Sequence, residues 1–179
     1  RIRLAPPRQS RYGGPMPDTD PSDIESLPPP PGFHALPIDI GFIGVNGPLF
    51  VKPEEGQLRL GMRIEMRHCN PMRIAHGGLL ATFIDMLMPF AIMYQGGLSG
   101  RFMPTIHLAQ EYLAPAPLGC WLEGTGDLLR ATRNLAFAQC LVTADGQPCL
   151  RASGIFKLGP ESGNHGLMAM LECMKDGPK

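Results

Sequence analysis

The sequence has no excess of charge of either sign. Its 16 lysines and arginines balance 16 aspartates and glutamates, so the net charge is zero and the pI is about 7.1. This balance excludes the strongly basic surface that is typical of nucleic-acid binding. Of the 179 residues, 44% are hydrophobic. That fraction is enough for one soluble domain with a core.

The sequence also lacks closely spaced cysteines and a long apolar run. Its five cysteines are odd in number and form no C-x-x-C pair, so we expect neither a disulfide framework nor a metal site. The longest apolar stretch, residues 79–94, is interrupted by Asp85 and Pro89. It is shorter than the roughly 20 residues that a bilayer requires, so it predicts a buried helix and no membrane span. No apolar run follows Arg1, so we expect no secretory signal. The cysteine pattern, without a disulfide framework, makes a reducing cytoplasm the expected compartment.

Proline is concentrated at one end of the chain. Ten of the 20 prolines fall within residues 1–37, including four in a row at 28–31. A polyproline stretch has no internal hydrogen bonds, so we expect residues 1–37 to form an arm that is ordered only against the domain or a neighbouring subunit. We assign residues 38–160 to one domain and 161–179 to a tail. Four apolar residues of that tail have the spacing of a short amphipathic helix, namely Leu167, Met168, Leu171 and Met174.

The domain shows strand patterns around one helical pattern. Apolar and polar residues alternate over 57–67, which predicts a strand with one wet face. Between 79 and 92, apolar residues recur at three- and four-residue spacing on nearly every side, so this helix must be wrapped by other elements. Four more strand-like runs follow, and Asp145–Gly146 between the last two predicts a hairpin. We therefore expect an α+β fold in which one long antiparallel sheet, ending in a four-stranded meander, wraps around a central helix.

Asp85 is an unusual residue for the middle of such a helix. A buried carboxylate needs partners, a raised pKa or access to a cavity. Capping of another loop or an ion pair with an arginine is the structural explanation, and a catalytic role is the functional one. Pro89 removes the helical N–H partner of the Asp85 carbonyl, so we expect a bend at this point.

The sequence His76-Gly77-Gly78 stands at the predicted start of the helix. Two glycines allow a ligand to approach backbone N–H groups, and a helix N-terminus carries partial positive charge. This combination is suited to binding an oxyanion. A simple turn and a structural histidine are the alternatives.

The stretch N-P-M-R-I-A-H-G-G-L-L-A-T-F-I-D, residues 70–85, resembles the hotdog-fold acyl-CoA thioesterases, specifically the phenylacetate-degradation type (PaaI-like). The resemblance extends over about residues 57–158. It implies a hotdog fold, thioester hydrolysis, and catalytic roles for Asn70, His76, Gly77 and Asp85. Thr105 stands where a Ser or Thr often completes the family's site. No cofactor is implied, because coenzyme A (CoA) is part of the acyl-CoA substrate.

Gly77 and Asp85 are eight residues apart, or about 12 Å along one helix. One thioester carbon cannot contact both, so we expect the carboxylate to come from a second chain in a homodimer with antiparallel helices. The family is known to form such dimers, and pairing of dimers into a tetramer is a further expectation. Gly77 N–H would then stabilise the oxyanion, and Asp85 would act as general base or as nucleophile. Asn70 would hold the carbonyl or the water, and Thr105 would bond the carboxylate or the water.

CoA phosphates require cations. Arg130 and Arg133 beside a predicted turn are candidates, and Arg101 and Lys157 are others; a solvated charged surface is the alternative for each of them. Gly78 is a candidate for substrate contact. Methionines 86, 88, 93 and 103 suit an acyl pocket or ordinary core packing. Two other functions remain open, a non-catalytic acyl-CoA sensor and a hotdog hydratase or dehydratase. The sequence has no G-x-S-x-G motif, which argues against a serine hydrolase.

Overall fold

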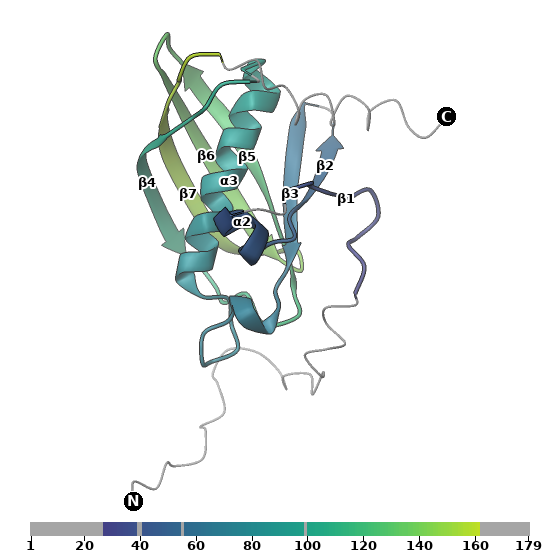
Figure 1. Ribbon diagram of the computed structural model, residues 1–179. Helices are drawn as coiled ribbons and strands as arrows, with labels where there is room; N and C mark the ends of the chain where they lie inside the picture. Colours follow the sequence, from purple (N-terminus) through teal and green to yellow (C-terminus); the bar gives the residue numbers. More distant parts are fainter. Residues whose placement is uncertain (1–26, 39–40, 55, 99, 162–179) are drawn as a thin grey trace, which may run out of the picture.

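The computed structural model describes residues 27–38, 41–54, 56–98 and 100–161 (Figure 1). Most of the predicted arm and the predicted tail helix therefore lie outside the described residues. The elements in chain order are β1 (His34–Ala35), α2 (Gly41–Asn46), β2 (Phe50–Glu54), β3 (Gln57–Arg63), the 3-10 helix η1 (Met66–His68), α3 (Gly77–Gly96), β4 (Thr105–Tyr112), β5 (Trp121–Ala131), β6 (Leu135–Ala144) and β7 (Gln147–Lys157).

Seven antiparallel strands form one sheet in the order β1-β2-β3-β5-β6-β7-β4. The long helix α3 lies across one face of this sheet, and the short helix α2 lies over α3 on the side away from the sheet (Figure 1). The predicted hairpin is confirmed, because Asp145 and Gly146 join β6 to β7 with φ values of 47° and 80°. Both values suit the tight turn that matches strand twist. The predicted sheet around one helix is thus present.

The predicted four-stranded meander is wrong in its first strand. β5, β6 and β7 are consecutive neighbours, but β4 pairs with β7 at the far edge of the sheet and does not contact β5 as a strand partner. The link from β4 to β5 crosses the N-terminal end of α3, where Ala75 N donates to Ala116 O at 2.7 Å and Leu118 N donates to Arg73 O at 2.9 Å. This crossing carries the chain from one edge of the sheet to its interior. β4 is therefore left as an edge strand beside α3.

Close contact between α3 and β5 depends on two glycines. A Cβ at Gly124 would lie 2.6 Å from Leu87 Cδ2, and a Cβ at Gly126 would lie 2.8 Å from Ala91 Cβ. Both distances are shorter than a van der Waals contact, so only glycine allows the helix to sit this close to the sheet. Pro89 lies inside α3, and the helix continues on both sides of it from Gly77 to Gly96.

Helix α3 is long and apolar enough to cross a membrane by length and composition alone, but half of that stretch is buried within the domain. Its buried side chains contact the sheet and form the core. Burial of this kind is what a core helix of a globular domain shows.

The described end of the proline-rich segment lies on the sheet. Phe33 is buried against Trp121, with ring centroids 5.0 Å apart, and the guanidinium of Arg63 donates to Pro28 O at 3.1 Å. β1 pairs with β2 immediately afterwards. Residues 28–35 are thus held by contacts with the domain.

Candidate functional site

The N-terminus of α3 is shaped by His76. This residue is the N-cap, and its Nδ1 accepts a hydrogen bond from Gly78 N–H at 2.9 Å. Its own backbone N–H donates to His68 O at 2.8 Å. Because Nδ1 is an acceptor, the ring is in the form that carries its proton on Nε2. The side chain acts here as a helix cap, which satisfies one of the amides that a helix start leaves unpaired.

Gly77 N–H differs from its neighbour. Among the described residues it makes no hydrogen bond, whereas Gly78 N–H is used by His76. Of the two glycine amides, that of Gly77 is therefore the one available to an incoming oxygen. It lies at the positive end of the helix, where an anionic oxygen is stabilised.

Tyr112, at the end of β4, covers Gly77. Its hydroxyl donates to Gly77 O at 3.0 Å and accepts from Gln110 Nε2 at 2.6 Å. A Cβ at Gly77 would lie 3.0 Å from that hydroxyl oxygen. The sequence analysis did not single out Tyr112. This residue reaches the helix N-terminus only because β4 lies at the edge of the sheet, and the sequence pattern does not predict that position.

Asn70 shapes the loop before the helix. Its Oδ1 accepts from Met72 N at 2.9 Å and Ile74 N at 3.4 Å, and its carbonyl accepts from Arg73 N at 2.9 Å. Arg73 has a φ of 58°, a conformation that is uncommon for residues with a side chain. The oxygen of the Asn70 side chain thus closes a turn. These bonds do not use its amide N–H groups, which are the groups that a substrate carbonyl would contact.

Asp85 is half-buried on α3 and its partner is a hydroxyl. Thr105 Oγ1 donates to Asp85 Oδ1 at 2.5 Å, which joins the middle of the helix to the start of β4. Among the described residues, Asp85 forms no ion pair, so the structural explanation by an arginine fails. The carboxylate lies on a partly open face of α3, and it has a partner, as a carboxylate on this helix was expected to need.

The predicted site residues form two groups within one chain. Asn70, His76, Gly77 and Gly78 lie at the helix start, whereas Asp85 and Thr105 lie about 12 Å farther along α3. The predicted phosphate-binding residues, Arg130 and Arg133, are exposed and belong to neither group. They follow Leu128, whose N–H donates to Gln95 Oε1 at 2.7 Å near the C-terminal end of the helix.

A buried histidine, His68, is hydrogen-bonded to the N-cap residue of α3 through its backbone carbonyl. His68 is 2% exposed, and its Nδ1 accepts from Glu65 N at 2.9 Å. Burial, with the nearby Arg67 guanidinium, lowers the pKa of His68 to about 4. The neutral ring therefore persists at physiological pH, and the carbonyl of the same residue holds His76.

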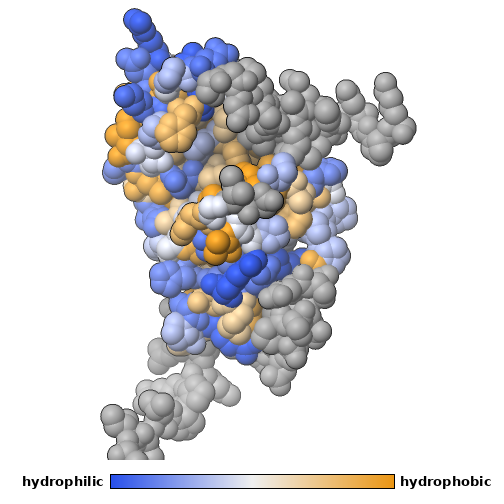
Figure 2. All heavy atoms as spheres, in the orientation of Figure 1, coloured by the Kyte–Doolittle hydropathy of each residue, from blue (hydrophilic) through white to orange (hydrophobic). Residues whose placement is uncertain are grey.

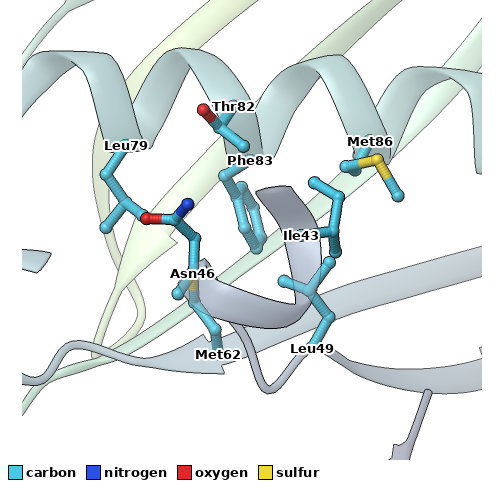
Figure 3. A pocket seen from close by; sticks show the side chains of 8 residues that line it. All are labelled: Ile43, Asn46, Leu49, Met62, Leu79, Thr82, Phe83 and Met86. Carbon is cyan, nitrogen blue, oxygen red and sulfur yellow. The ribbon is translucent and has the colours of Figure 1, made fainter. Parts of the chain in front are cut away.

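A small apolar pocket lies between α2 and α3 (Figure 3). Ile43 of α2 points toward Met86, and Asn46 points toward Leu79 (Figure 3). The free space is about 10 Å³, enough for one water molecule. This pocket is too small for an acyl group, although Met86 lines it. Met88 and Met103 are buried in the core, which confirms ordinary packing for these two.

Metal ligation and cysteine chemistry find no support in the described residues. No three His, Cys, Asp or Glu side chains gather there as a metal site requires. Burial raises the pKa of the Cys140 thiol to about 12 and that of Cys149 to about 11, and it raises that of Cys120 as well. Thiols in such surroundings are poor nucleophiles.

Comparison with known proteins identifies the family. Residues 72–150 match the Thioesterase superfamily. A putative esterase of Pseudomonas aeruginosa is 30% identical over 130 residues, which cover 72% of this chain and 96% of that protein. The chain belongs to the thioesterase superfamily.

Two further similarities agree with this family. The mouse protein named acyl-coenzyme A thioesterase 13 is 31% identical over 83 residues, 46% of this chain and 57% of that protein. The crystal structure of zebra fish thioesterase superfamily member 2 superimposes with a TM-score of 0.60 at 25% identity, over 78% of this chain and 93% of that one. The fold is the hotdog fold of this superfamily.

Proposed function

We propose that this protein hydrolyses acyl-CoA thioesters in a site shared by two subunits. Gly77 N–H of one subunit binds the thioester oxygen, and Asp85 of the partner subunit supplies the carboxylate. The distance between Gly77 and Asp85 within one chain is the observation behind this proposal. About 12 Å of helix separates the two residues, and the hydrogen bond from Thr105 holds the Asp85 carboxylate away from Gly77 of the same chain. The hydrolytic activity is inferred from membership of the thioesterase superfamily. CoA as the thiol part of the substrate is inferred from the relative named acyl-coenzyme A thioesterase 13.

The surface around α3 supports a dimer. Partly exposed residues in the middle of α3 recur on one face and are small or apolar except for Asp85, namely Ala81, Thr82, Asp85, Met86 and Pro89. Figure 2 shows hydrophobic side chains gathered on this side of the molecule, over α2; Phe42 and Val45 of α2 are each about two-thirds exposed. β4 is an edge strand with unpaired backbone groups and an exposed Ile106. A second copy would cover these features in a twofold arrangement.

The chemistry follows from this arrangement. A water oxygen attacks the thioester carbon while the partner's Asp85 accepts the water proton, and negative charge develops on the carbonyl oxygen beside Gly77 N–H. The C–S bond then breaks, and the CoA thiolate takes from Asp85 the proton that this carboxylate had accepted, so the carboxylate is regenerated. Direct attack by the carboxylate, with a mixed anhydride that water then hydrolyses, uses the same groups. One oxyanion donor typically contributes about 3 kcal/mol to the lowering of the barrier.

The antiparallel pair of helices also suggests a place for CoA. In an antiparallel pair with Gly77 opposite Asp85, the C-terminal end of the second helix extends about 16 Å beyond the first helix N-terminus. In the second chain, Leu128 is bonded to Gln95 near that end, and Arg130 and Arg133 follow Leu128 in the sequence. We place the CoA phosphates there, with the pantetheine arm spanning the interval and Gly78 at the thioester end. The N–H groups of the Asn70 side chain would hold the substrate carbonyl.

Free thiol release from a panel of short-chain, long-chain and aryl acyl-CoAs tests the function. We expect turnover by the wild-type protein and a loss of about 100-fold or more in Asp85→Ala and Asp85→Asn. Asp127→Asn, a carboxylate exposed on the sheet, is the matched control and should retain full activity. Unchanged turnover in both Asp85 variants would remove this residue from the mechanism. No turnover by the wild type on any substrate would favour an acyl-CoA sensor.

A further inference from the structure

The peptide unit between Gly77 and Gly78 is held at both ends by side chains. Its carbonyl oxygen accepts from the Tyr112 hydroxyl at 3.0 Å, and its N–H donates to His76 Nδ1 at 2.9 Å. Two successive glycines have more backbone freedom than any other residue pair. The contacts of His76 and Tyr112 therefore help to keep this first turn in one orientation.

Tyr112 is itself fixed from two directions. Gln110 Nε2 donates to its hydroxyl at 2.6 Å, which leaves the hydroxyl proton directed at Gly77 O. The backbone of Tyr112 pairs with Leu150 of β7, so the sheet register sets where the ring stands. The hydroxyl and ring carbons lie 3.0–3.7 Å from the place where a Gly77 Cβ would be. The ring thus occupies the space that the missing side chain leaves.

We infer that Tyr112 is a positioning residue for the oxyanion donor, an inference that rests on the proposed function. Gly77 N–H adjoins the peptide that Tyr112 and His76 hold, so its direction depends on that peptide. Tyr112 does not contact the reacting atoms; it acts through the backbone. A donor that is aimed in advance stabilises the charge of the transition state without reorganisation, and a small misalignment weakens that effect.

Tyr112→Phe tests this inference, because it removes the hydroxyl and keeps the ring. We expect kcat for acyl-CoA hydrolysis to fall about tenfold, while KM changes less than about twofold. The affinity for an S-alkyl-CoA thioether should stay the same, since this probe has no carbonyl to place beside Gly77. Gln110→Met, which removes the donor to Tyr112, should lower kcat in the same direction.

Tyr94→Phe is the matched control. Its hydroxyl also donates to a backbone carbonyl, that of Glu54 at 3.1 Å, but near the other end of α3. We expect kcat of this variant to remain at the wild-type value. A full kcat in Tyr112→Phe, or an equal loss in Tyr94→Phe, would overturn the positioning role while the proposed function stands. A wild-type protein without turnover would refute the proposed function, and the inference with it.

Discussion

Mixing two inactive variants tests whether the site is shared between subunits. The first variant is Asp85→Asn, which removes the carboxylate. The second is Gly77→Pro, which removes the N–H donor and also adds a Cβ that lies 3.0 Å from the Tyr112 hydroxyl. Proline lacks the N–H group and is favoured at the first position of a helix. His76 already has the extended backbone that a residue before proline requires, with φ of −64° and ψ of 139°.

The expected magnitudes follow from the roles of the two groups. Loss of the oxyanion donor should lower kcat about 100-fold, and loss of the general base about 100- to 10,000-fold. After random exchange of subunits, about half of the dimers are mixed, and one of the two sites in each combines an intact Gly77 with an intact Asp85. The mixture should therefore regain about a quarter of the wild-type rate.

The assay measures free thiol release by each variant alone and by the equimolar mixture after exchange. Gly77→Ala is the matched control, since it places a Cβ at the same 3.0 Å from the Tyr112 hydroxyl and keeps the N–H. Gly77→Ala should be clearly more active than Gly77→Pro, because it carries the same Cβ and keeps the N–H donor. A mixture as inactive as its two components, with mixed dimers demonstrated, would refute the shared site.

Two further predictions concern stability and are measured by urea unfolding. Gly126→Ala should lower the free energy of unfolding by about 1–3 kcal/mol, because the new Cβ would lie 2.8 Å from Ala91 Cβ and overpack the core. Thr125→Ala, on the opposite face of the same strand, should change it by less than about 0.5 kcal/mol; equal effects would contradict the packing argument. The second prediction concerns pH. The pKa of His68 is lowered from 6.5 to about 4, so above pH 6.5 the ring is neutral in both states, and between pH 6.5 and 4 the unfolded chain binds a proton that the folded protein does not. The free energy of unfolding should fall over this range by about 3 kcal/mol through this group, and His68→Gln should lack this contribution. Equal pH dependence in both proteins would show that His68 is not its source.

Features that depend on near neighbours in the chain were predictable. The apolar spacing of residues 79–92 predicts a helix that must be wrapped, and α3 is that helix. Asp145–Gly146 predicts a hairpin, since these two residues tolerate the positive φ of a tight turn. The resemblance of residues 70–85 to a known family supplied the fold and the superfamily, which the comparisons confirm.

Features that depend on distant contacts were not predictable from the same patterns. The alternation of β4 does not reveal that it pairs with β7 across the sheet. The partners of the candidate site follow from that placement, because β4 carries both Thr105 toward Asp85 and Tyr112 toward Gly77. No local signal marks Tyr112 as a partner of a residue 35 positions earlier.

The sequence by itself determined the helix, the hairpin and the residue types available for chemistry, because local backbone preferences and side-chain periodicity depend only on adjacent residues. The tertiary structure decided the order of the strands, including the pairing of β4 with β7, and through it the placement of Tyr112 against Gly77. These are properties of how the segments pack, and packing depends on the shape and hydrogen bonds of the whole domain rather than on any one segment.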